Sequence, residues 1–236
     1  MQKIEIACNS IGSCIQALNG GADRIELFEN LSDGGCTPSY GTIKASLTLG
    51  LPIYVMIRPR GGNFCYNTIE TDIMLHDIEA CKNIGVHGIV FGCLNAHGEV
   101  DIDLNKRLLN AWAGPATFHR AIDRCKDIKS ASHKVLDLGF ERILSSGGAN
   151  DVLKGLNQLK SMQEDIGKHI VIMPGAGVTS QNAAHILSIT GCNEIHATCK
   201  SSSHFMDPNF NPEFKDVETI SNEIEVKALV KAVREL

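Results

Sequence analysis

The sequence's first candidates for acid–base chemistry and anion binding stand near the ends of hydrophobic runs. His119 lies near the end of the run Ala116–Ala121, and Asp123 follows shortly after it. An imidazole titrates near neutral pH, so His119 is the candidate general acid or base, and we expect Asp123 to orient it. Arg58 and Arg120 are candidates for anion binding, because a guanidinium holds a carboxylate or phosphate through two parallel hydrogen bonds. For Arg120, an ion pair outside the strand is the alternative.

A second candidate catalytic group consists of Glu5, Glu26 and His196, which lie in three other hydrophobic runs. Two carboxylates and an imidazole can form an acid–base pair. They can also hold a divalent ion, since these ligands suit harder metals than thiolates do. A buried polar layer that only fills space is the alternative, because buried polar groups persist when they are paired.

Glycine, serine and lysine in three later segments predict a site for a phosphate or carboxylate group. In an α/β barrel, phosphate is commonly bound after the seventh and eighth strands, where backbone N–H groups converge. Gly175, Gly177 and Lys200 occupy those two positions, and Ser146 with Gly147 extends the site from the sixth strand. Ordinary turn chemistry is the alternative for the glycines.

Cysteine is the third kind of reactive residue. The nine cysteines are irregularly spaced and include no C-x-x-C pair, so the sequence predicts neither a disulfide framework nor a structural zinc site. Copper(I) prefers thiolate and thioether ligands. Cys65, in a glycine-rich loop beside Arg60, is expected to carry an exposed and acidified thiol. Cys8 is the second candidate metal ligand, and inert packing is the alternative for any single cysteine.

The elements that must position these side chains are eight short β-branched runs separated by helical segments. The runs start about 27 residues apart, which is the spacing of a repeated strand and helix. Eight such units predict a (β/α)8 TIM barrel, with residues 1–236 as a single domain. Ser10, Asp127 and Ser180 are the expected helix N-caps. The runs are Ile4–Cys8, Arg24–Phe28, Ile53–Arg58, Gly88–Gly92, Ala116–Ala121, Arg142–Ser146, Ile170–Pro174 and Glu194–Cys199.

A weak internal repeat indicates which side chains face the barrel interior. A four-residue step from glycine to isoleucine recurs at Gly21–Ile25, Gly85–Ile89, Gly139–Ile143 and Gly191–Ile195, at the even-numbered runs. If those isoleucines pack on the helices, strand alternation turns the next residues inward as one layer. That layer is Glu26, Val90, Leu144 and His196. By the same alternation Glu5 and Asn9 face inward, whereas Cys8 shares the parity of helix-facing residues.

Three longer motifs resemble those of a known family. The segments Gly34–Ser39, Arg58–Tyr66 and Thr117–Asp123 are similar to motifs of the CutC family, known as copper homeostasis proteins. The resemblance implies a barrel fold, a cytoplasmic location and self-association as a homodimer or higher homo-oligomer. It also implies a link to copper, with copper(I) as the cofactor to test.

Composition excludes several classes of function. Hydrophobic residues make up 43% of the chain and charged residues 21%, with a formal net charge of −5, so no broad positive field is present to bind nucleic acid. No apolar run approaches the length of a transmembrane helix, and Glu5 interrupts the place where a signal peptide needs apolar residues. We therefore expect a cytoplasmic protein with neither nucleic acid nor membrane as a partner.

These observations leave two functional hypotheses. The first is an enzyme that performs acid–base chemistry on a small anionic substrate carrying a phosphate or carboxylate. The alternative is a non-catalytic copper(I)-binding protein that uses cysteines at the barrel mouth. Residues 201–217 are expected to form a long loop that either covers the mouth as a lid or packs under the final helix.

Overall fold

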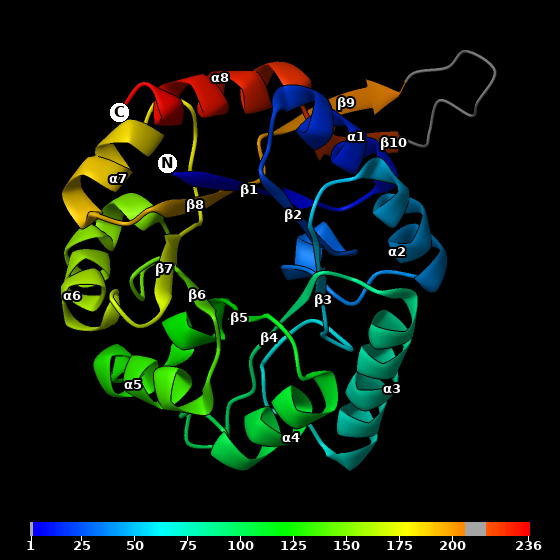
Figure 1. Cartoon of the computed structure of the whole chain (residues 1–236), viewed down its shortest axis with the longest axis vertical. Helices are drawn as coiled ribbons and strands as arrows, with labels where there is room; N and C mark the ends of the chain where they lie inside the picture. Colours follow the sequence, from blue (N-terminus) through cyan, green and yellow to red (C-terminus); the bar gives the residue numbers. More distant parts are fainter. Residues whose placement is uncertain (1, 206–215) are drawn as a thin grey trace.

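The computed structural model describes residues 2–205 and 216–236, and within them eight parallel strands form a nearly closed ring (Figure 1). The hydrogen-bonded order is β7-β6-β5-β4-β3-β2-β1-β8. The predicted (β/α)8 barrel is therefore confirmed, with six of the eight strands ending one to three residues earlier than expected. The strands are β1 Lys3–Cys8, β2 Arg24–Leu27, β3 Ile53–Met56, β4 Gly88–Phe91, β5 Ala116–Phe118, β6 Arg142–Ser145, β7 Val171–Pro174 and β8 Glu194–Ala197.

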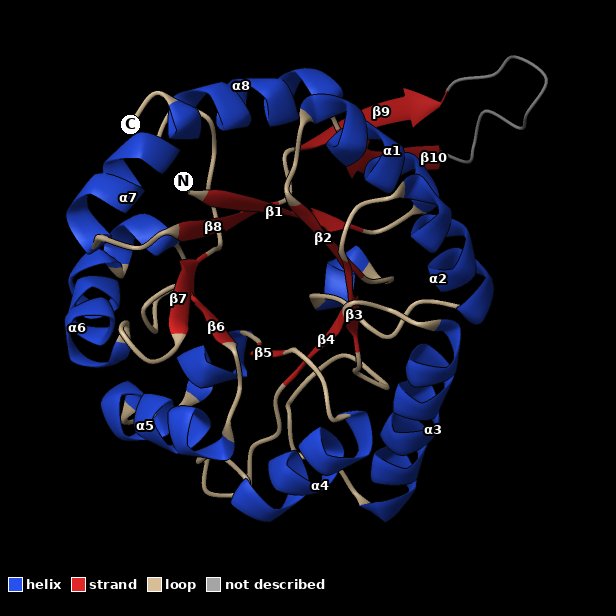
Figure 2. Ribbon diagram, viewed as in Figure 1, coloured by secondary structure: helices blue, strands red, loops and turns tan. Residues whose placement is uncertain are grey.

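The helices surround the strands and cover their outer face (Figure 2). The Ser10 and Asp127 side chains cap α1 and α5 as predicted. Ser180 does not cap a helix, because α7 begins later and Asn182 takes the N-cap position. The helices are α1 Ile11–Gly20, α2 Tyr40–Ser46, α3 Thr68–Ile84, α4 Ile102–Trp112, α5 Ile128–Leu138, α6 Leu156–Ile166, α7 Ala183–Thr190 and α8 Glu223–Arg234, with short 3-10 turns at Leu31–Asp33, Leu47–Leu49, Arg120–Arg124 and Val152–Lys154.

Alternation along the strands separates two cores. The isoleucines of β1, β2 and β4 join Cys8 in the large core between the strands and the helices. A second, smaller apolar cluster lies on the other face and contains Ala7, Phe28, Tyr54, Met56 and Val90. The predicted interior layer is confirmed, since Glu26, Val90, Leu144 and His196 are all buried on the parity opposite to the helix-facing isoleucines.

The segment after β8 differs from its prediction. Residues 201–217 are not a continuous loop, because β9 Lys200–Phe205 pairs antiparallel with β10 Asp216–Ser221. Figure 1 shows this hairpin projecting outward beside α1 rather than across the ring. The polar run Lys200-Ser-Ser-Ser carries no apolar alternation from which a strand can be recognised. The middle of the expected lid, residues 206–215, lies outside the described residues.

No helix in the described part of the chain is long and apolar enough to cross a membrane.

Candidate functional site

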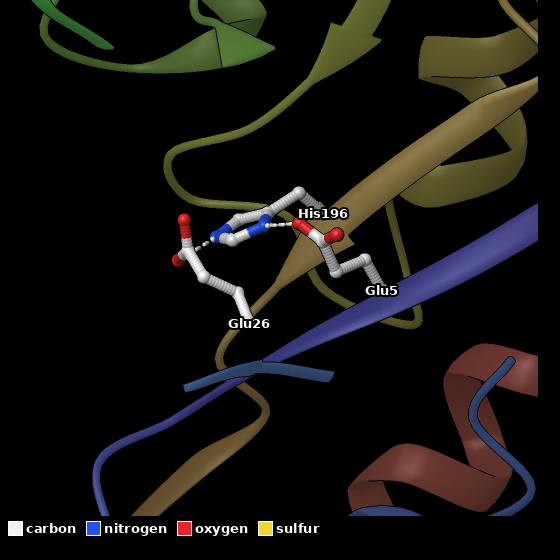
Figure 3. A group of neighbouring side chains, drawn as sticks. All are labelled: Glu5, Glu26 and His196. Carbon is white, nitrogen blue, oxygen red and sulfur yellow. Dashed lines mark hydrogen bonds and ion pairs between the residues drawn. The ribbon is translucent and has the colours of Figure 1, made fainter. Parts of the chain in front are cut away.

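Glu5, Glu26 and His196 meet inside the barrel, as the sequence predicted. They stand on the neighbouring strands β1, β2 and β8, where Glu5 is paired in register with His196. Figure 3 shows the imidazole between the two carboxylates. His196 Nδ1 lies 2.8 Å from Glu5 Oε1, and His196 Nε2 lies 3.6 Å from Glu26 Oε2. The three groups therefore interact directly.

The two carboxylates of this cluster differ in their surroundings. Burial raises the pKa of Glu26 to about 7; the charge of Glu5 adds to this effect, while His196 and Arg24 oppose it. Glu26 Oε1 is buried and has no hydrogen-bond partner. Burial would raise the pKa of Glu5 as well, but Arg24, His196 and Arg142 together hold it well below its usual range. Glu5 is therefore ionised at neutral pH, while Glu26 is close to half protonated.

His196 stands between them as the third titrating group. Burial alone would lower the pKa of His196, but the neighbouring carboxylates of Glu26 and Glu5 raise it above the usual value. The imidazole and the Glu26 carboxyl consequently both bind their protons more tightly than the same groups do in water. Such a pair can pass a proton between its members or to a bound molecule.

Beneath the cluster lies a charged floor, formed by Arg24, Arg142 and Glu194, that was not predicted from the sequence. Arg24 donates from Nε to Glu5 and from Nη2 to Glu194 Oε2 at 2.6 Å. Arg142 reaches the same Glu194 oxygen from Nε at 2.7 Å. The guanidinium carbons of Arg24 and Arg142 stand 5.0 and 5.4 Å from the centre of the Tyr54 ring. This floor fixes the Glu5 carboxylate.

A sequence signal for the floor existed. In the glycine-to-isoleucine repeat, Arg24, Gly88, Arg142 and Glu194 each directly precede the shared isoleucine. They therefore share the inward parity of the predicted layer, one step lower on each strand. Gly88 is the small member because the Tyr54 ring takes its space: a Cβ on Gly88 would lie 2.3 Å from Tyr54 Cε1.

His119 is buried at the strand end, but Asp123 does not orient it. His119 Nδ1 accepts a hydrogen bond from the Ala121 backbone N–H at 3.3 Å, and His119 Nε2 has no partner. Burial, together with the charge of Arg58, lowers the pKa of His119 to about 3. The expectation that His119 titrates near neutral pH is therefore wrong, because desolvation disfavours the charged imidazolium.

Asp123 instead holds the loop after β6. Its carboxylate accepts hydrogen bonds from Ser145 Oγ at 2.6 Å, from the Ser146 N–H at 3.1 Å and from the Gly148 N–H at 3.0 Å. It also accepts from Arg120 Nε at 2.9 Å. The Asp123 carboxylate thus accepts hydrogen bonds from backbone N–H groups of the loop that was predicted to bind an anion.

The other predicted anion-binding groups of this loop are also bonded within the protein. Arg120 Nη2 donates to Ser146 Oγ at 2.9 Å, so the ion-pair alternative for Arg120 matches the observed contacts. The Gly147 N–H donates to Ser145 Oγ at 2.8 Å. These contacts stabilise the loop, and they differ from the open anion site predicted for Ser146 and Gly147.

The segments after β7 and β8 do not form one anion site around Lys200. Gly175 faces the interior, where a Cβ would lie 2.6 Å from Leu144 Cδ1. Gly177 adopts φ +83, and a Cβ there would lie 2.5 Å from Asp151 Oδ2. A phosphate bound at Gly177 would be repelled by the Asp151 carboxylate. Lys200 is exposed at the start of the β9 hairpin.

Arg58 is buried and is held by backbone carbonyl groups. Its Nη1 donates to Asp33 O at 2.8 Å and to Gly35 O at 2.6 Å, and Nη2 donates to Gly62 O at 3.0 Å. Only Nε is without a hydrogen-bond partner. Arg58 therefore fixes the loops that follow β2 and β3, a role that the sequence did not indicate.

The predicted thiol site differs from expectation. Cys8 is fully buried in the helix-facing core, where burial raises the pKa of its thiol well above the usual value. The Cys65 thiol is half-buried and lies 3.1 Å from Asn95 O, to which it donates. Arg60 contacts the Cys65 carbonyl at 2.9 Å rather than the sulfur. Within the described residues, the one cluster of at least three metal-ligand side chains is Glu5, Glu26 and His196, which contains no sulfur.

Comparison with known proteins identifies the family. The model of the CutC family matches residues 2–201, which include every candidate site residue. The chain belongs to the CutC family. It is 45% identical over 202 residues to a CutC family protein of Parabacteroides distasonis, covering 84% of this chain and 83% of the relative. It is 41% identical over 201 residues to the human copper homeostasis protein cutC homolog, covering 84% and 74%.

Solved structures agree with this assignment. The CutC crystal structure from Streptococcus agalactiae superposes with a TM-score of 0.80 at 34% identity, covering 84% of this chain and 99% of that one. A thiamine phosphate pyrophosphorylase from Pyrococcus furiosus, at 14% identity and a TM-score of 0.64, shares the barrel fold alone. The CutC-like barrel is thus shown by sequence and by structure.

Proposed function

We propose that this CutC family protein is an enzyme that transfers a proton to or from a small anionic substrate inside the barrel, with Glu26 as the acid–base group. The main observation behind this proposal is the environment of Glu26. Glu26 is buried, its pKa is raised to about 7, and one of its carboxyl oxygens has no hydrogen-bond partner. A general acid or base works best when its pKa lies near the operating pH. Glu26 Oε1 is the atom that would face the substrate.

His196 and Glu5 support that role through charge balance. The two arginines of the floor, Arg24 and Arg142, balance the carboxylates of Glu5 and Glu194. A single proton shared between Glu26 and His196 then makes these two residues neutral as a pair, so the net charge of all six side chains is zero. Binding of a substrate next to Glu26 can therefore shift that proton without creating an uncompensated buried charge.

We prefer proton transfer to a divalent metal site at the same three residues. A metal ligand must be deprotonated, whereas the raised pKa values of Glu26 and His196 favour their protonated forms. Arg24 also occupies one oxygen of Glu5 and places a positive charge beside the cluster. Both features disfavour a cation there.

Proton transfer is testable without knowing the substrate. The protein is incubated in D2O with a mixture of small metabolites, and deuterium incorporation is followed by mass spectrometry. We expect at least one anionic compound to gain deuterium with the wild type, and Glu26→Gln to slow that exchange by at least about 100-fold. Glu225→Gln, on the exposed part of α8, is the matched control and should exchange at the wild-type rate.

Two results would overturn the proposal. One is that no compound in a broad metabolite mixture exchanges. The other is that Glu26→Gln, shown to be folded by circular dichroism, exchanges as fast as the Glu225→Gln control.

Copper(I) binding is the alternative suggested by the human relative's name, and the described thiols do not fit it. Five of the nine cysteines are buried, and Cys65 already donates its thiol hydrogen to Asn95 O. Copper(I) needs two or three soft ligands within bonding reach. In an anaerobic titration of reduced protein against a chelator, we therefore expect Cys65→Ser to match the wild type. A clear loss of copper affinity in that variant would favour the copper-binding alternative.

We also propose a cytoplasmic location, which follows from the family resemblance, and self-association. One face of α1 carries Ile11, Ile15 and Leu18, which are 37%, 40% and 36% exposed and lie one helical turn apart. An exposed apolar stripe of this kind favours a contact with a second copy. Sedimentation velocity should show a dimer or larger species for the wild type and a monomer for Ile15→Glu. A monomeric wild type would contradict the proposal.

A further inference from the structure

Arg58 carries a buried positive charge that the described residues do not balance. The residue is 3% exposed, and its three hydrogen bonds from Nη1 and Nη2 all go to backbone carbonyl oxygens. In the described ranges, no carboxylate lies within ion-pair distance of Arg58, and its Nε has no partner. An unpaired buried charge is costly, so the site lacks one negative charge.

His119 supplies a second unpartnered donor beside Arg58. Because Nδ1 accepts the Ala121 N–H, the proton of the neutral ring is on Nε2, which is buried and has no partner. The ring stays neutral because burial and Arg58 lower its pKa. Gly92 directly follows β4, which lies between β3 and β5, and it leaves space for this ring. A Cβ on Gly92 would lie 2.8 Å from His119 Nδ1.

Tyr66 supplies the third unpartnered donor. Its hydroxyl oxygen is buried without a hydrogen-bond partner. Burial raises the pKa of Tyr66, whereas the charge of Arg58 and its contact with the phenol oxygen lower that pKa, so the hydroxyl lies beside the same guanidinium. Arg58 can only donate to that oxygen, which leaves the phenol hydrogen without an acceptor. Phe64 joins the group: the Arg58 guanidinium carbon lies 4.9 Å from the Phe64 ring centre, and the His119 ring centre lies 4.8 Å from it.

Buried donors without partners are rare in native proteins, and a group of three that includes Arg58 itself requires an explanation. We propose that Arg58 Nε, His119 Nε2 and Tyr66 Oη form the recognition site for a carboxylate group of the substrate. A carboxylate offers up to four acceptor positions to these donors and carries the single negative charge that Arg58 lacks. A phosphate dianion would bring more charge than one guanidinium balances.

The carboxylate site at Arg58 and the acid–base group Glu26 together define a substrate with a carboxylate at one end and its reacting atom at the other. Arg58 and His119 follow β3 and β5, whereas Glu26 and His196 stand on β2 and β8 of the same ring. The apolar side chains of Met56 and Val90 belong to the interior cluster on β3 and β4. Because it rests on the proposed proton transfer, this inference names the substrate class: a small carboxylic acid with its reacting atom at Glu26.

The segment that covers the site must move for a ligand to enter. Phe64 and Tyr66 both belong to the loop between β3 and α3, and both side chains are half-buried. Arg60 in that loop is paired with Glu70 on α3 across a partly exposed surface. Arg60 also donates to the carbonyl oxygens of Asn63 and Cys65, so opening of the loop must break these contacts together with the ion pair.

Formate is the probe, because it is the smallest carboxylate. Protein labelled with 15N is titrated with formate while the Arg58 Nε–H resonance is followed, and crystals are soaked in formate. We expect a saturable shift and a formate ion within hydrogen-bond distance of Arg58 Nε. Tyr66→Phe should weaken formate binding about tenfold, as the loss of one hydrogen bond to a charged group predicts.

The controls separate this inference from the proposed function. Tyr54→Phe removes another partly buried tyrosine hydroxyl, whose partner is Glu141 near the floor, and it should bind formate like the wild type. Glu26→Gln should also bind formate normally, even though it loses proton exchange. A single bound water that formate does not displace, or a shift that never saturates, would overturn the recognition site. Saturable binding of inorganic phosphate but not formate would do the same.

Discussion

Glu26 differs from the other buried carboxylates of the barrel in having no guanidinium contact. Glu5 and Glu194 each accept hydrogen bonds from an arginine, and the pKa of both is lowered. Glu26 contacts only His196 among the charged groups, at 3.6 Å, and its pKa is raised. Burial therefore decides the protonation state of Glu26, whereas ion pairing decides that of its neighbours.

This difference predicts a specific pH dependence of stability. The pKa of Glu26 rises from 4.5 to about 7 on folding, so the folded state binds the proton more tightly than the unfolded state. The stabilising contribution is complete below pH 4.5 and is lost as pH rises through about 7. Relative to Glu26→Gln, the wild type should lose on the order of 3 kcal/mol of unfolding free energy across that window.

Urea denaturation of both proteins at pH 5 and pH 8 measures this difference. Glu26→Gln removes the titrating group and keeps the side-chain volume, so distant titrating groups contribute similarly to both proteins, whereas His196 loses the Glu26 charge that helps to raise its pKa. Parallel pH profiles for wild type and variant would show that Glu26 has an ordinary pKa in the folded protein.

At the scale of elements, the loop after β6 depends on one side chain from another element. Asp123 lies in the 3-10 turn Arg120–Arg124 and reaches Ser145, Ser146 and Gly148 through its two carboxylate oxygens. Its side chain is 5% exposed, so these are buried, charge-assisted hydrogen bonds. The carboxylate thus joins two consecutive strand–helix connections of the barrel.

Asp123→Asn tests that role. The amide turns two N–H donors toward a loop that itself offers donors, so we expect a loss of about 3 kcal/mol in unfolding free energy. Amide hydrogen exchange at Ser146 and Gly148 should become faster. The pH titration of His119 should be unchanged, because Asp123 does not contact that ring. An unchanged stability with an altered His119 titration would instead support the orienting role that the sequence suggested.

The sequence predicted the eight barrel strands well because strand alternation and glycine stops are local signals, whereas the polar β9–β10 hairpin carries no such signal. The inward direction of Glu26 and His196 followed from parity alone. The partners of Asp123 and Arg58 did not follow, since they are backbone groups of loops whose path the sequence pattern does not specify. The low pKa of His119 was missed for a similar reason: burial beneath Phe64 depends on how a distant loop folds over the strand end.

At the scale of the whole molecule, the barrel is closed by side chains where its backbone ladder is interrupted. The hydrogen-bonded order of the described strands begins with β7 and ends with β8, so these neighbours share no ladder. Arg142 on β6 spans that gap to Glu194 on β8 at 2.7 Å. Arg24 adds contacts from β2 to Glu194 and, at 3.4 Å, to the sulfur of Met173 on β7.

Glu194→Gln should therefore weaken closure of the barrel. The substitution leaves two buried guanidinium groups with one carboxylate fewer, and breaking a buried ion pair in this way costs about 3–5 kcal/mol. Urea denaturation measures that loss, with Glu225→Gln as the exposed control. Hydrogen exchange should accelerate first at the β7 and β8 amides, since these strands have no ladder between them. Equal acceleration in all eight strands would mean that Glu194 stabilises the barrel as a whole and does not close the β7–β8 gap.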